Sequence, residues 1–146
     1  MSFERILLPT DGSTASERAA ARAIDLATES GAALEVIHVL EDRPLPFGEH
    51  SDALRETLES EAEAFVDAVV ERASDAGVGT VDGTVVRGTP YETIVALAEE
   101  RGCDLVVMGT HGRTEHEPYV LGSVTVRVLQ HSPVEVLVVP THETIR

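Results

Sequence analysis

The sequence predicts one α/β domain over residues 1–146, with an open parallel five-stranded sheet and helices on both of its faces. Three observations predict this fold. Apolar, strand-like runs alternate with helical patterns from end to end. The intervening segments are long enough for parallel crossovers. Neither a second domain nor an internal repeat interrupts the alternation, and 146 residues fit a single domain.

The strands are predicted by short apolar runs, most of which are continuous rather than alternating. Strands buried on both faces of a parallel sheet require that pattern. The runs are Ile6–Leu8, Leu34–Leu40, Val81–Val86, Leu105–Met108 and Val136–Val139.

The first two helices are predicted by capping signals and apolar stripes. The segment Thr14–Glu17 fits a capping box with Thr14 as N-cap, and Gly31 suits the end of that helix. A longer helix is predicted over residues 51–76, before Gly77.

The third helix is predicted to begin sharply, with Thr89 as N-cap, Pro90 at the first helical position and Glu92 reaching back to the cap. It is expected to stop near Gly102. The preceding pair, Arg87–Gly88, follows the third apolar run and is interpreted as a turn rather than as a group that approaches a ligand from the side.

Charge is the unusual feature of the composition. Acidic residues number 26 against 11 basic ones, the net charge is −15, and every basic residue is arginine. Such a surface repels phosphates, which argues against nucleic acid as a partner. The acidic residues are spread along the chain, which is typical of the solvated surface of a halophilic protein and less so of a patch for a basic partner.

Composition also bears on the compartment. The single cysteine, Cys103, excludes an internal disulfide, and it is interpreted as a small semi-buried residue rather than a reactive thiol. The sequence shows neither a signal peptide nor an apolar run of membrane-spanning length. A cytoplasmic protein without a membrane partner is therefore expected.

Ligands of open α/β sheets bind beyond the carboxyl ends of the strands. Gly109 and Gly112 follow the fourth run, and Gly122 and Ser123 open the last helix, which ends before Pro133. Glycines allow close approach of the backbone, and a helix start offers free N–H groups to a phosphate. The hydroxyls of Ser123 and Thr125 are expected to add donors. This spacing predicts a phosphate site, although a glycine-containing turn without a ligand is the simpler alternative.

The spacing Gly109-x2-Gly112-x9-Gly122-Ser123 resembles the ATP-binding signature of the universal stress protein family. The resemblance extends over nearly the whole chain, including the opening Ile6–Ser13 and the pair His38–Val39. It implies a Rossmann-like sheet of order 3-2-1-4-5, which brings Asp11 and Gly109 to one crevice.

The resemblance also implies a set of site residues. Those that would line adenine and ribose are Pro9, Thr10, Asp11, Val39 and Met108. Those that would hold ribose and phosphates are Gly109, Gly112, Gly122, Ser123, Val124 and Thr125. For Asp11 considered by itself, a capping or turn role is an equal alternative.

The implied function is adenine-nucleotide binding, ATP in the first place, in a stress-response or regulatory protein. The family resemblance, together with the exposed edge expected at residues 134–140, predicts a homodimer through the last strand. No catalytic residue is assigned, so at most weak ATP hydrolysis is expected. A slow ATPase and a nucleotide-free dimeric interaction module are the alternatives.

The nine residues between Gly112 and Gly122 carry acidic Glu115 and Glu117. Carboxylates near phosphates repel them unless salt or a cation intervenes. We therefore expect nucleotide binding to need Mg²⁺ or Mn²⁺, or high salt. The neighbouring His111 and His116 have no recognised metal-ligand spacing and are interpreted as part of a solvated loop.

Overall fold

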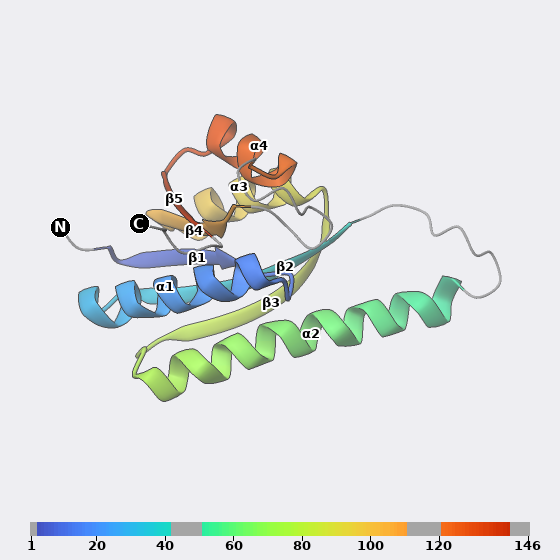
Figure 1. Ribbon diagram of the computed structural model, residues 1–146, viewed down its shortest axis with the longest axis horizontal. Coiled ribbons are helices and arrows are strands. Elements are labelled where there is room, and N and C mark those ends of the chain that lie inside the picture. Colours follow the sequence, from blue (N-terminus) through green and yellow to red (C-terminus); the bar gives the residue numbers. More distant parts are fainter. Residues whose placement is uncertain (1–2, 42–50, 111–120, 141–146) are drawn as a thin grey trace, which may run out of the picture.

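A five-stranded parallel sheet forms the centre of the protein (Figure 1). The computed structural model describes residues 3–41, 51–110 and 121–140. The strand order is β3-β2-β1-β4-β5, with every pairing parallel, so the predicted fold class and strand order are confirmed. The strands are β1 Arg5–Pro9, β2 Ala33–Glu41, β3 Val81–Gly88, β4 Leu105–Gly109 and β5 Glu135–Val139.

Two helices cover each face of the sheet. Figure 1 shows α1 (Thr14–Ser30) and α2 (Ser51–Ala76) on one side, and α3 (Pro90–Glu100) and α4 (Ser123–His131) on the other. Each layer encloses its own apolar core. Within β1, Ile6 and Leu8 pack against the first pair, whereas Leu7 packs towards the second. Burial on both faces explains why the central strands are continuously apolar.

Helix α2 lies very close to the edge strand β3. A Cβ atom built on Gly83 would come within 2.5 Å of Val66 Cγ1 and 2.8 Å of Val70 Cγ2 on the helix. This contact fixes the carboxyl-terminal half of α2 on the sheet. The helix is longer than the strand, so its amino-terminal part projects beyond the ends of β2 and β3 (Figure 1).

The strands end at different heights. Pro9, the last residue of β1, pairs with Ile37, but β2 continues to Glu41, which pairs with Gly88 of β3. The ends of β2 and β3 therefore form a wall beside the shorter β1. Arg87 and Gly88 belong to β3, so the predicted turn at this pair is wrong.

The opposite edge of the sheet is β5, which pairs with β4 and with no other described strand. Its residues after Glu135 are half-buried. The chain just after β5 is tied to the first helix, because Arg18 Nε donates to the Pro140 carbonyl oxygen at 3.0 Å.

Two capping predictions need correction. Helix α1 is capped by Ser13, whose Oγ accepts from the Ser16 amide at 3.1 Å, rather than by Thr14. Thr89 precedes α3 as expected but makes no side-chain cap hydrogen bond. Glu92 accepts from the Tyr91 hydroxyl at 3.3 Å instead of reaching back. Pro90 at the start of α3 already supplies the required backbone geometry.

In the parts of the chain that the structure describes, no helix is both long enough and apolar enough to cross a membrane.

Candidate functional site

The ends of β1 and β4 lie side by side at the point where the strand order reverses. Ile6 pairs with Leu105 and Leu7 with Val106, and the strands end at Pro9 and Gly109. From β1, the chain proceeds to β2 and β3 on one side of the sheet, and later to β4 and β5 on the other. Such a switch point is where open α/β sheets form a ligand crevice.

Thr10 begins the turn after β1, and its polar groups are used to hold that turn. Its amide donates to Ile37 O at 2.8 Å, and its hydroxyl donates to Ser16 Oγ at 3.2 Å. His38 Nδ1 lies 2.6 Å from Thr10 O. A carbonyl oxygen only accepts, so Nδ1 carries the proton. Thr10 is 5% exposed and therefore acts mainly as a support.

Asp11 is half-buried and takes part in the turn. Its Oδ1 accepts from the Ser13 amide at 3.0 Å. Its Oδ2 has no hydrogen-bond partner within the described ranges and remains available to accept from a ligand. The next residue, Gly12, has φ +79°, and a Cβ there would lie 2.6 Å from the Phe65 ring. The turn role of Asp11 is thus observed, and it leaves one oxygen unused.

Gly109 at the end of β4 is required by packing. A Cβ on Gly109 would stand 2.7 Å from both Cβ and O of Ala15, in the first turn of α1. The Thr125 hydroxyl donates to Gly109 O at 3.0 Å, and Thr125 is only 3% exposed. Its single hydroxyl proton is therefore used to join β4 to α4 and is not available to a phosphate.

The amino terminus of α4 lies beside the end of β4, at the same switch point. Gly122 is the N-cap and makes no side-chain cap hydrogen bond, while its amide donates to Thr110 O at 2.7 Å. The amides of Val124 and Thr125 have no acceptor among residues 3–41, 51–110 and 121–140. The side chain of Ser123 is exposed. Free N–H groups and the positive end of a helix dipole suit an anion.

The apolar members of the predicted site lie beside this crevice. Met108 is 6% exposed and packs in the core beneath α3 and α4, with Val39 partly buried against the same core. Pro9 is half-buried at the end of β1. Gly112 and the acidic insert with Glu115 and Glu117 lie outside the described residues, as do His111 and His116.

An ionic cluster that the sequence analysis missed lies at the other end of the sheet, near the amino-terminal ends of β1, β2 and β4. Glu35 is 6% exposed, and its two carboxylate oxygens accept from Arg5 Nη1 and Arg101 Nη1, each at 2.8 Å. Asp104 accepts from the Arg5 amide at 3.2 Å. The signal was a carboxylate within an apolar strand, because a buried charge needs partners. The partners themselves are too distant in sequence to be recognised.

Cys103 lies beside that cluster and is fully buried in the α3/α4 core. Burial raises the pKa of its thiol from 9.0 to about 11, with a further contribution from the negative charge of Glu35. The positive charges of Arg5 and Arg101 lower the pKa of the thiol, but by less than burial and Glu35 raise it. The interpretation of Cys103 as an unreactive residue agrees with this environment, although the side chain is more buried than expected, at 4% exposed.

Comparison with known proteins identifies the family. Residues 2–140 match the model of the universal stress protein family. The chain belongs to this family. It is 36% identical to the universal stress protein MJ0531 of Methanocaldococcus jannaschii over 140 residues, which covers 94% of this chain and 82% of that relative.

Solved structures agree with the family assignment. The hypothetical protein MJ0577 superimposes with a TM-score of 0.86 at 32% identity, covering 99% of this chain and 100% of that one. A universal stress protein solved in complex with cAMP gives a TM-score of 0.74 at 29% identity, covering 97% and 100%. At least one structural relative of this universal stress protein was thus solved with a cyclic adenine nucleotide.

Proposed function

We propose that this universal stress protein binds an adenine nucleotide, with ATP as the first candidate, in the crevice between the ends of β1 and β4. Three considerations support the proposal: the family, the relative solved with cAMP, and the chemistry of the crevice. The observation that carries most weight is the start of α4. Its cap has no side chain, and its Val124 and Thr125 amides have no acceptor in the described chain.

In this proposal the phosphates lie against the α4 amino terminus, held by the Val124 and Thr125 amides and the exposed hydroxyl of Ser123. Gly112 and Gly122 belong to the same phosphate subsite. Gly109 keeps the end of β4 free of a side chain. The donors are mainly backbone groups, so Mg²⁺ or Mn²⁺ would reduce repulsion between the phosphates and this acidic protein.

The adenosine part lies nearer to β1 and β2. Asp11 Oδ2 accepts from a ribose hydroxyl or from the adenine amine, while Pro9, Val39 and Met108 provide the apolar contacts. Thr10 supports this subsite from within, because its own polar groups are already bonded.

The experiment compares the wild type with two variants. Bound nucleotide is released by denaturation and identified by ion-exchange chromatography, and ATP–Mg²⁺ is then titrated at high salt. Asp11→Asn keeps an oxygen for the Ser13 amide but removes the charge, whereas Ser123→Ala removes an exposed hydroxyl. Each variant should bind ATP about tenfold more weakly, which is the effect of losing one charge-assisted hydrogen bond. Saturable binding that neither variant changes would place the ligand elsewhere.

A second candidate is a nucleotide-free dimeric interaction module. It is favoured by the number of crevice donors already used within the protein: the Thr125 hydroxyl, the Gly122 amide and the Thr10 hydroxyl. Under this alternative the protein is purified empty and ATP does not raise its melting temperature. A slow ATPase is distinguished from both by turnover that disappears in Asp11→Ala.

The proposed assembly is a homodimer in the cytoplasm, formed through the edge of β5 that pairs with no other described strand. A strand edge with unpaired backbone groups needs a partner or a cover. Light scattering after gel filtration should give twice the chain mass, and Val138→Pro should return the protein to a monomer. A monomer at all accessible concentrations would reject this part of the proposal without affecting nucleotide binding.

A further inference from the structure

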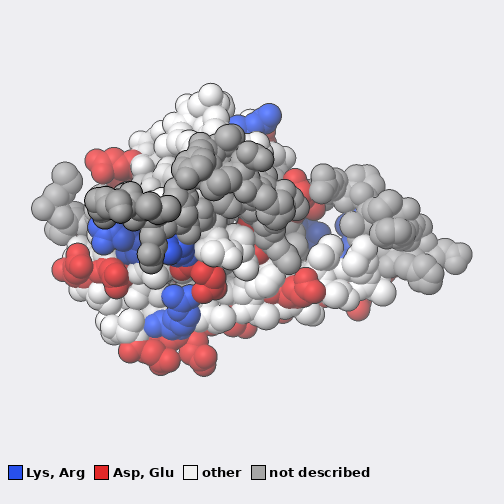
Figure 2. Space-filling view, in the orientation of Figure 1, with Lys and Arg blue, Asp and Glu red and all other residues white. Residues whose placement is uncertain are grey.

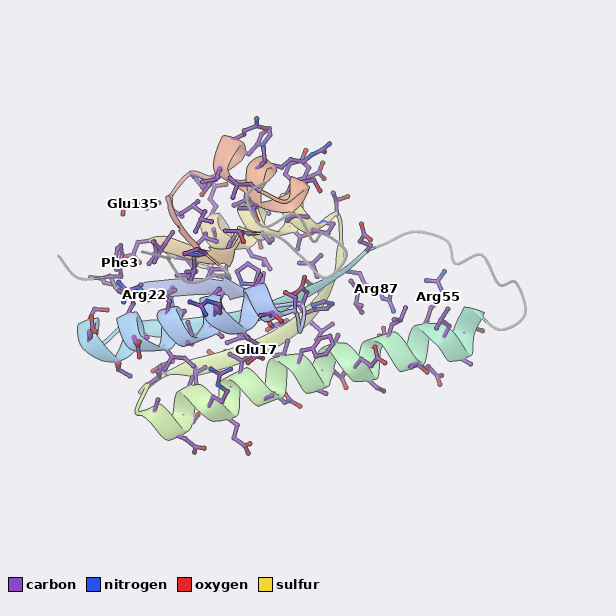
Figure 3. All side chains as sticks on the ribbon, viewed as in Figure 1. Phe3, Glu17, Arg22, Arg55, Arg87 and Glu135 are labelled. Carbon is purple, nitrogen blue, oxygen red and sulfur yellow. The ribbon has the colours of Figure 1, made fainter. Side chains whose placement is uncertain are left out.

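A hollow of about 270 Å³ lies where the projecting part of α2 faces the ends of β2 and β3. Its lining includes His38 and Leu40 from β2, Arg55 and Leu58 from α2, and Arg87 from β3. Figure 3 shows the labelled side chains of Arg55 and Arg87 in the space between the helix and the strand ends. Figure 2 shows basic side chains at the recess where α2 leaves the body of the molecule.

The two arginines differ in their partners. Arg87 pairs with Glu59 of α2, so its charge is already balanced. Glu59 stands four residues after Arg55, the spacing at which a helical pair normally forms, but it bonds to Arg87 instead. Arg55 makes no hydrogen bond or ion pair with any described residue. A half-buried guanidinium that has no carboxylate partner in the described part of the chain is unexpected in a protein with 26 acidic residues.

The side chains around Arg55 indicate which class of ligand the hollow would bind. A guanidinium donates two parallel hydrogen bonds to a carboxylate. Leu40 and Leu58 are half-buried and offer apolar surface in the same lining. A single arginine without a partner among the described residues, beside two leucines, therefore suits a single carboxylate on a short apolar chain.

We infer that this hollow is a second binding site, which takes a small aliphatic monocarboxylate with its head group on Arg55 and its chain against Leu40 and Leu58. The site is separate from the phosphate-binding end of the crevice, although Val39 lines the hollow and is also assigned to the proposed adenosine subsite. The inference does not depend on the proposed nucleotide function. A protein that binds no nucleotide would still present Arg55 in the same setting.

The test is a titration of the full chain with hexanoate at fixed salt, followed by calorimetry and by amide and side-chain NMR. Saturable binding is expected, with the largest chemical-shift changes at His38, Leu40 and Leu58. Arg55→Gln should weaken it by at least about tenfold, the effect of losing a charged hydrogen-bond donor. Arg22→Gln is the matched control, since Arg22 is an exposed arginine of α1 without a described partner (Figure 3).

Two further probes test the chemistry. Hexan-1-ol, which has the same chain without the charge, should bind more weakly than hexanoate, and sulfate should not compete with it. The inference is overturned if Arg55→Gln and Arg22→Gln have equal effects, if hexan-1-ol binds as well as hexanoate, or if the shifts cluster around Asp11 and Ser123. NMR spectra of Arg55→Gln that match the wild type outside the hollow exclude misfolding as the cause of lost binding.

Discussion

At the scale of single residues, Gly12 meets two separate constraints. Its φ of +79° is costly for a residue with a side chain, and any Cβ would also overlap the Phe65 ring at 2.6 Å. Gly31 has a similar φ of +72°, but nothing lies within 4 Å of its Cβ position. Comparing these two glycines therefore separates the cost of backbone strain from the cost of a steric clash between α2 and the turn that holds Asp11.

Gly31→Ala is expected to cost about 1 kcal/mol of unfolding free energy, for the left-handed backbone alone. Gly12→Ala should cost roughly 1–3 kcal/mol more, because Phe65 must move. Urea denaturation of both variants measures the difference. Equal losses would mean that Phe65 yields freely and does not fix the turn.

Cys103 leads to a prediction about pH. Its folded-state pKa of about 11 lies above its ordinary value of 9.0, so the neutral thiol contributes stability that is fully present below pH 9. That contribution is lost as the pH rises from about 9 towards 11, because the unfolded chain ionises first. Iodoacetamide should therefore label the native protein near pH 8 far more slowly than the urea-unfolded chain. Similar rates would contradict the burial of the thiol.

Residue roles were the least predictable part from sequence. Ser13 and Thr14 are adjacent hydroxyl residues that cap helices almost equally well, so only the backbone geometry decides between them. Thr125 matches the phosphate motif, yet its proton goes to Gly109 O, which is 16 residues away. For Asp11, both roles considered from the sequence remain compatible, one on each carboxylate oxygen.

At the scale of elements, Glu35 joins β2 to the start of β1 and to the end of α3 through Arg5 and Arg101. Removing a buried charge between two cations leaves both without compensation. The side chains of Arg5 and Arg101 are 39% and 30% exposed, so water recovers part of the loss.

Glu35→Gln should lower the free energy of unfolding by about 1–3 kcal/mol. Glu17→Gln is the control, because the Glu17–Arg72 pair is exposed on both sides and should contribute about 0–1 kcal/mol. High salt should remove the effect of Glu17→Gln and preserve most of that of Glu35→Gln. A Glu35→Gln loss that disappears in salt would mean that the cluster behaves as a surface pair.

The elements themselves were largely predictable, since strands buried on both faces leave continuous apolar runs that survive any detail of packing. The strand Leu34–Leu40 was recognised in spite of Glu35. By contrast, the extension of β3 through Arg87 and Gly88 was missed, because it depends on pairing with Leu40 and Glu41 of a distant strand. Glycine before a proline-led helix is more typical of a turn.

At the scale of the whole molecule, a net charge of −15 opposes the folded state through self-repulsion. Figure 2 shows acidic side chains scattered over the visible face, including along α2. Such a charge distribution is destabilising at low salt and is relieved by screening.

The free energy of unfolding in urea should therefore rise with KCl, as the screening length falls from about 10 Å at 0.1 M to about 3 Å at 1 M. Each kcal/mol gained corresponds to roughly 3 °C in Tm for a domain of this size. Betaine, which does not screen charges, is the control solute. An equal gain in KCl and betaine would attribute the effect to solute exclusion rather than to charge.

Helix α1 contacts both the proposed nucleotide site and the chain segment that follows β5. Ala15 in its first turn fills the space beside Gly109 at the end of β4, and Arg18 in the next turn binds Pro140 just after β5. A ligand in the crevice and a second chain on β5 would therefore both act on the same helix. Thermodynamic linkage then requires that, if the ligand raises the affinity between two chains by some factor, dimerisation raises the affinity for the ligand by the same factor.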